Sequence, residues 1–204
     1  VVTWCSGDSV DEVKAKLEAR SVLIADYMAA NMLCLNKSKT QVCWFGTSGI
    51  PVCIDGTIVD PSTEIEVLGV QVSQNLRFTP YLKKTIATAR QILGVLRRLS
   101  CHLPPGPLIR NLARGLLVGK VGYAAAAVMA PRLDSNDVIE DKSVMDDLQV
   151  LLNDAARVVS GANRRQRIQR ENLLKRAGLP SINQLAVKAV ASEAWKTINI
   201  MVGP

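Results

Sequence analysis

Residues 31–45 of the chain read Asn-Met-Leu-Cys-Leu-Asn-Lys-Ser-Lys-Thr-Gln-Val-Cys-Trp-Phe. The stretch follows a helical pattern and runs into an apolar alternation, and this change of period predicts a helix–turn–strand joint. Its centre suits a turn because short polar side chains bond nearby backbone groups, and Lys37 and Lys39 place two cations there. The apolar residues expected to line the two flanks of the joint are Leu33, Leu35, Val42, Trp44 and Phe45.

A helix is predicted before this joint. Ser9-Val10-Asp11-Glu12 has the Ser-x-x-Glu form of a capping box, so the helix is expected to run from Val10 to about Ala30. Asp8, Asp11 and Glu12 are interpreted as parts of this helix start and not as metal ligands. Val1–Cys5 is β-branched and aromatic, which predicts the end of a strand. The apolar stripe of the helix is expected to hold Val13, Leu17, Val22 or Leu23, and Tyr27.

Short strands are predicted after the joint. Ile50–Ile54 and Thr57–Val59 flank Asp55-Gly56, a dipeptide typical of a hairpin turn. Glu64–Val72 predicts a further strand that becomes apolar at Leu68, Gly69 and Val70. A glycine inside a strand permits close backbone approach, either to a ligand or to another strand in ordinary sheet packing, and both interpretations stay open.

The clearest helix of the sequence is predicted from Pro80 to about Ser100, with Thr79 as its N-cap. Leu82, Ile86, Ala89, Leu93 and Leu96 share one face. The opposite face carries five cations without an acid between them. Alternating signs would give stabilising pairs on a merely solvated face, so the pattern favours a surface that faces phosphates. These cations are Lys83, Lys84, Arg90, Arg97 and Arg98.

Further helices are predicted over residues 108–129, 143–160, 171–177 and 182–201, after a proline-rich turn at 101–107 that is a possible boundary. Arg164, Arg165 and Arg167 lie in a basic run that either contacts phosphates or forms a solvated loop. The last helix is expected to bury Ala186, Val187, Val190, Ala194 and Trp195. The predicted fold class is α+β, mainly α, with short antiparallel strands in residues 1–78 and a helical bundle in residues 79–204.

Charge and composition narrow the function classes. The chain carries a net charge of +7, and residues 79–132 hold nine Lys or Arg and no Asp or Glu, which indicates a polyanion surface or a basic solvated face. Five scattered cysteines and one histidine, His102, give no metal-ligand spacing, so reduced thiols in an intracellular protein are expected, in the nucleus or cytoplasm, without a metal site. The apolar run 116–130 is short and interrupted by Lys120, which argues against a membrane partner.

The pattern Asn-x-Leu-x-Leu-Asn-x-x-Lys-Thr at residues 31–40 resembles motif D of reverse transcriptases of non-LTR (LINE-type) retrotransposons. Tyr27 stands where the family commonly has tryptophan. The segment 64–78, with Leu68-Gly69-Val70, is similar to the family's primer-grip hairpin. Later similarities to the post-polymerase region are Asp147-Leu148-Gln149, Leu152-Asn153-Asp154-Ala155-Ala156-Arg157, Leu173-Leu174 and Gly178-Leu179-Pro180-Ser181.

The resemblance implies a palm edge followed by a thumb-like bundle that binds an RNA or DNA primer–template duplex. It places Lys39 at the motif D lysine, near a leaving pyrophosphate, although a solvated turn lysine is an equal interpretation. The carboxylates that hold Mg²⁺ in the complete polymerase would precede Val1, so this chain is expected to need the palm and fingers for nucleotide addition and to bring no cofactor of its own. The alternatives are a standalone nucleic-acid-binding module, or a remnant or protein-interaction module without catalysis.

Overall fold

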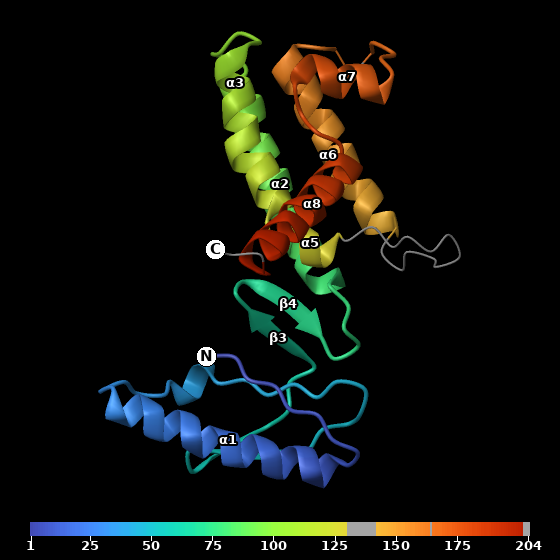
Figure 1. The fold of residues 1–204 in the computed structure, drawn as a ribbon. Helices are drawn as coiled ribbons and strands as arrows, with labels where there is room; N and C mark the ends of the chain where they lie inside the picture. Colours follow the sequence, from blue (N-terminus) through green and yellow to red (C-terminus); the bar gives the residue numbers. More distant parts are fainter. Residues whose placement is uncertain (130–141, 164, 202–204) are drawn as a thin grey trace. The chain divides into compact units, whose positions relative to one another are not determined.

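The computed structural model describes residues 1–129, 142–163 and 165–201 and is mainly helical with two small antiparallel sheets (Figure 1). The chain divides into two compact units, Val1–Pro80 and Tyr81–Pro204. The α+β, mainly α class is therefore observed, with all the described strands in the first unit. None of the described helices is both long and apolar enough to cross a membrane.

The first unit begins with α1 (Val10–Ala30), and the predicted capping box sets its start. The Ser9 Oγ accepts a hydrogen bond from the amide of Glu12 at 3.2 Å, and Glu12 Oε2 accepts one from the amide of Asp8 at 3.0 Å. Two amides that the helix cannot pair internally are thus satisfied by side chains. The helix ends at Asn31, whose amide nitrogen donates to the carbonyl of Tyr27.

The predicted apolar stripe of α1 is wrong beyond Leu17. Val22, Leu23 and Tyr27 are exposed, whereas Ser21 is buried. The inward position four residues after Leu17 is Ser21, and its hydroxyl donates to the carbonyl of Glu18 at 2.7 Å, so a polar residue takes a core position without an unmet hydrogen bond. The helical period thus continues through a serine.

Two hairpins follow the short 3₁₀ turn η1 (Lys37–Lys39). β1 (Val52–Ile54) pairs with β2 (Thr57–Val59) across Asp55-Gly56, as predicted, and both turn residues have positive φ. β3 (Glu64–Val67) pairs with β4 (Val70–Ser73). The core of the unit consists of Val42, Trp44 and Val52, covered by Val10, Val13, Leu17, Ile50, Ile54 and Val59.

Three strand predictions in this unit are wrong. Val1–Cys5 forms no strand, and Val1 and Trp4 are 95% and 76% exposed. The segment after the joint makes only one bridge, from Val42 to Pro61, and Phe45 is exposed rather than in the core. Leu68 and Gly69 are the turn of a hairpin, with φ of 50° and 80°, and not the interior of one strand. Glycine favours this left-handed conformation, which explains why it stands in the turn.

The second unit begins with α2 (Thr79–Leu99), whose predicted apolar face is buried throughout. The chain turns at 101–107, inside this unit, and returns through α3 (Pro107–Leu112), the π-helical segment η2 (Ala113–Val118), α4 (Gly119–Gly122) and α5 (Ala125–Val128). The single helix predicted over 108–129 is therefore broken. Ala124 has φ of +56°, and the Tyr123 carbonyl accepts a hydrogen bond from the buried Tyr81 hydroxyl at 3.0 Å. Burial raises the pKa of that hydroxyl.

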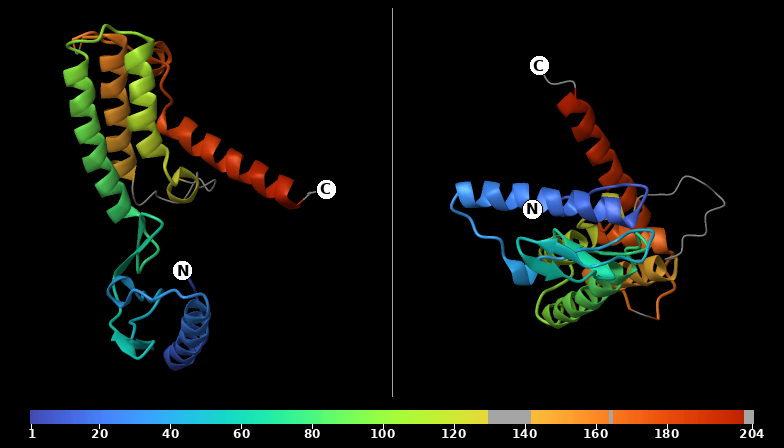
Figure 2. Two further views of the ribbon diagram at one scale, coloured as in Figure 1. Left: turned by 90° about the vertical axis from the view of Figure 1, so that its left-hand side faces the viewer. Right: turned by 90° about the horizontal axis from the view of Figure 1, so that it is seen from below.

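The unit is completed by α6 (Lys142–Ser160), α7 (Arg170–Ala177) and α8 (Ile182–Met201). α2, α6 and the returning helix lie side by side, and α8 projects away from them (Figure 2). The residues expected to face inward from α6 are buried, and Gly178 ends α7 in the left-handed conformation, as predicted. In α8 the prediction is wrong for Val187, Ala194 and Trp195, which are exposed because neighbouring helices cover only its first turns.

Candidate nucleic-acid interface

The cationic face of α2 is formed as the helical period predicts. Lys83, Lys84, Arg90, Arg97 and Arg98 are all exposed, and Leu82, Ala89 and Leu96 on the opposite face are fully buried. The apolar face fixes the rotation of the helix against the bundle, so the cations are held outward by the packing of other residues. The rigid element therefore presents the charges and does not depend on a flexible loop.

Two acids of α6 meet this cationic face. Asp147 Oδ2 lies 3.8 Å from Arg90 Nη2, and Asp154 Oδ2 lies 2.6 Å from Arg97 Nη2. Both the two arginines and the two aspartates are seven residues apart, which is about two helical turns. α2 and α6 consequently run in the same direction and in register at this seam. The sequence analysis missed these acids because they lie far along the chain in another helix.

The seam divides the five cations of α2 into two rows. At about 100° per residue, Lys83, Arg90 and Arg97 follow one line, and Lys84 and Arg98 follow a second line about 100° further from the apolar face. Among the described residues, Lys83 and Arg98 make no ion pair. The surface available to an external anion without disruption of an ion pair is therefore smaller than the sequence suggested.

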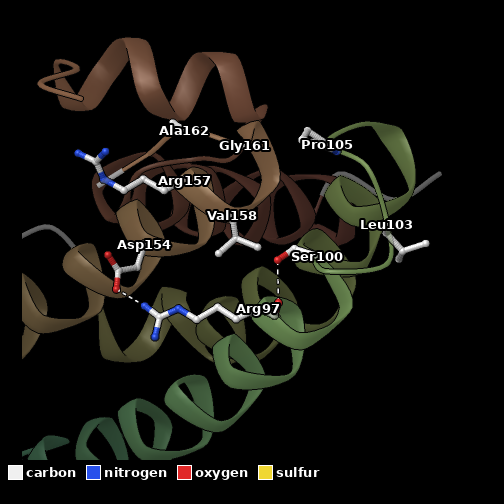
Figure 3. A pocket seen from close by; sticks show the side chains of 9 residues that line it. All are labelled: Arg97, Ser100, Leu103, Pro105, Asp154, Arg157, Val158, Gly161 and Ala162. Carbon is white, nitrogen blue, oxygen red and sulfur yellow. Dashed lines mark hydrogen bonds and ion pairs between the residues drawn. The ribbon is translucent and has the colours of Figure 1, made fainter. Parts of the chain in front are cut away.

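A pocket of about 270 Å³ lies where α2 and α6 end (Figure 3). The ion pair of Arg97 and Asp154 forms one side of it, and Ser100 donates a hydrogen bond to the Arg97 carbonyl at 2.7 Å. Leu103, Pro105, Val158, Gly161 and Ala162 provide apolar or backbone surface. The remaining lining residue, Arg157, directs its guanidinium to the loop after α6, with Nη1 2.9 Å from the Asn163 carbonyl and 3.3 Å from that of Gln166.

Arg157 therefore orders the loop that carries the second predicted group of cations. Arg165 and Arg167 are exposed on this loop, and the amide of Arg165 donates to Asn163 Oδ1 at 3.2 Å. Arg164, which was predicted with them, lies outside the described residues. Because α6 anchors the loop by two hydrogen bonds from one arginine, Arg165 and Arg167 occupy a defined segment next to the end of the helix.

The two turn lysines of the first unit have different surroundings. Lys37 Nζ donates to the Asp55 carbonyl at 2.9 Å and lies 3.4 Å from Asp55 Oδ2, so it ties η1 to the β1–β2 turn. Lys39 is exposed and has no side-chain partner within the part of the chain that the structure describes. Of the two, Lys39 is thus the ammonium that can bind an external group.

The hairpin turn of β3 and β4 presents its backbone outward. Leu68 is 84% exposed, and a methyl group placed on Gly69 would have no atom within 4 Å. Gly69 is thus required by its φ of 80° and not by close contact with another strand. Val70, the third residue of this predicted group, begins β4 opposite Val67.

The Mg²⁺ implied for a complete polymerase finds no matching site in the described residues, where no three His, Cys, Asp or Glu side chains gather as potential metal ligands. The acids near α2 are instead engaged with arginines. No protein-family model, curated protein or solved structure matches the chain.

Proposed function

We propose that this chain belongs to a reverse transcriptase of the non-LTR type, as palm edge and thumb, and that its helical unit binds the sugar-phosphate backbone of a primer–template duplex. The observation that carries the proposal is the row of exposed cations along α2, held outward by a buried apolar face. Backbone binding needs cations at fixed positions and no base-reading groups, because phosphates position a duplex without sequence information.

The charge distribution supports the same role. α2 contains no acid, and the loop after α6 adds Arg165 and Arg167 to the basic surface of the same unit. Lys39 would act in the complete polymerase as an electrostatic stabiliser or proton donor at the leaving pyrophosphate. Its exposed ammonium supports this assignment, in contrast to the engaged Lys37.

The experiment is a fluorescence-anisotropy titration of a labelled RNA–DNA duplex at several salt concentrations. We expect log Kobs to fall linearly with log salt, and the double variant Lys83→Gln/Arg98→Gln to flatten this slope by about 0.9 per lost phosphate contact. The matched control is Lys188→Gln, which removes an exposed charge on α8. Binding that is absent at low salt, or that responds equally to all these changes, would reject the proposal.

A second candidate function is protein interaction, favoured by the exposed apolar residues of α8. Val187, Trp195 and Ile198 are 58%, 67% and 62% exposed, and at about 100° per residue they fall on one side of the helix. Sedimentation analysis of the chain and of the variant Trp195→Ser/Ile198→Ser tests it. Self-association that the variant abolishes would support this candidate, whereas a monomer at all concentrations would argue against association through α8.

A further inference from the structure

We propose that Asp147 and Asp154 are built-in competitors of nucleic-acid phosphate for Arg90 and Arg97, and so limit how tightly the α2 face binds a backbone. This inference rests on the proposed backbone binding and adds two residues that reduce its strength. It concerns the seam between α2 and α6, where an acid of the same chain already occupies the place that a phosphate oxygen would take.

The geometry makes the two arginines available to different degrees. At the Arg90–Asp147 pair the atoms are 3.8 Å apart, and the side chains are 63% and 59% exposed. At the Arg97–Asp154 pair the distance is 2.6 Å, and the exposures fall to 45% and 30%. Solvent weakens an exposed and widely spaced pair more than a close one, so Arg90 exchanges its partner more readily than Arg97 does.

The carboxylates act in two ways. Each accepts the guanidinium hydrogen bonds that a phosphate would otherwise accept, since Arg binds either anion with the same donors. Each also adds a negative charge within a Debye length of Lys83 or Arg98 and lowers the positive potential there. A duplex must therefore displace an ion pair at each arginine, whereas it meets Lys83 and Arg98 directly.

The chain offers a control matched in charge and position. Asp146 is adjacent to Asp147 and exposed, but at about 100° per residue it points away from the α2 side. Within the described residues it forms no ion pair. Asp146→Asn and Asp147→Asn thus change the net charge equally, on the same turn of the same helix, and only the second removes a partner of α2.

The experiment measures duplex affinity and its salt dependence for the full chain and for Asp146→Asn, Asp147→Asn and Asp154→Asn. We expect Asp147→Asn to bind about three- to tenfold more tightly, with the slope steeper by up to about 0.9, the change for one added phosphate contact. Asp154→Asn should act in the same direction, and Asp146→Asn should change affinity less than twofold. The gain from Asp147→Asn must disappear in Arg90→Gln/Asp147→Asn.

The outcomes separate this inference from the proposed function. If the unaltered chain binds with salt dependence but Asp147→Asn and Asp154→Asn bind no more tightly than Asp146→Asn, the inference is wrong and backbone binding stands. A gain that survives in Arg90→Gln/Asp147→Asn would also overturn it, because a general charge effect would then explain the gain. If neither the chain nor any asparagine variant binds, both are rejected. Circular dichroism of each variant verifies that α2 and α6 remain folded.

Discussion

Arg97 on α2 and Asp154 on α6 form an ion pair of 2.6 Å two helical turns beyond the looser pair of Arg90 and Asp147. The repeat shows that the two helices run in the same direction, so their C-terminal ends meet at one end of the unit. Parallel helices place the negative ends of their dipoles together, and the arginines in both last turns, Arg97 and Arg157, offset this charge.

A double-mutant cycle will measure the seam. We expect Arg97→Ala and Asp154→Ala to show a coupling free energy of about 0.5–1 kcal/mol in urea unfolding, since the pair is close and partly shielded. The cycle of Arg90→Ala and Asp147→Ala serves as the comparison and should give about 0–0.3 kcal/mol, because both side chains are well solvated. Equal coupling in the two cycles would contradict the difference in geometry.

Gly161 at the end of α6 should resist substitution. Its φ is +67°, and a Cβ there would lie 2.7 Å from Pro105 Cγ, so Gly161→Ala strains the backbone and forces the proline turn to shift. We expect a loss of about 1–3 kcal/mol in the free energy of unfolding, measured by thermal or urea denaturation followed by circular dichroism. Gly94→Ala, inside α2 with open space around it, is the control and should raise stability by about 0.5–1 kcal/mol.

Much of the fold follows from local pattern. The capping box at Ser9, the Asp55-Gly56 hairpin and the apolar face of α2 were predicted from the sequence, because each depends on residues within one or two turns of one another. The breaks were not predictable in this way. Tyr123 ends a helix where its carbonyl accepts a hydrogen bond from Tyr81, which lies 42 residues earlier.

The candidate site shows the same limit. The cations of α2 could be identified from the sequence, but their neutralisation by Asp147 and Asp154 depends on a parallel arrangement that the intervening return helix makes possible. The period of α8 likewise defines an apolar side, yet periodicity does not reveal how far a neighbouring helix extends. Trp195 therefore lies on the predicted side and is nevertheless exposed.

Gly49 holds Trp44 in the core of the first unit. Trp44 is 5% exposed and donates from Nε1 to the Ile50 carbonyl at 3.1 Å, and a Cβ on Gly49 would overlap its ring. We expect Gly49→Ala to displace the indole and to cost about 2 kcal/mol or more. Trp4 and Trp195 are exposed, so a red shift in tryptophan emission would report Trp44 alone. Ser48→Ala, at the exposed neighbouring position, should leave the emission unchanged.

Glu12 gives the start of α1 a pH-dependent component of stability. Lys16, 2.6 Å away, and then the amide of Asp8 hold the pKa of the Glu12 carboxyl below its usual value of 4.5. A carboxyl whose pKa is lowered on folding stabilises the protein above about pH 4.5, and this contribution is lost as the pH falls through the folded-state pKa. Thermal melts should show Glu12→Gln less stable than the unaltered chain at neutral pH and equal to it at low pH. Lys16→Met should shrink the difference, and a gap that persists at low pH would contradict the assignment.

Arg157 should control the order of the loop that carries Arg165 and Arg167. Its guanidinium bridges the carbonyls of Asn163 and Gln166, and removal of both hydrogen bonds leaves two acceptors to solvent and the loop without its tie to α6. We expect Arg157→Met, which keeps the length of the alkyl chain, to accelerate tryptic cleavage after Arg165 and Arg167 several-fold, because proteolysis follows local opening. Arg98→Met is the control, since it removes an exposed arginine that makes no ion pair within the described part of the chain. Equal cleavage in both variants would show that Arg157 does not order the loop. If loop order supports backbone binding, Arg157→Met should also weaken duplex affinity while Asp154 and its partner stay in place.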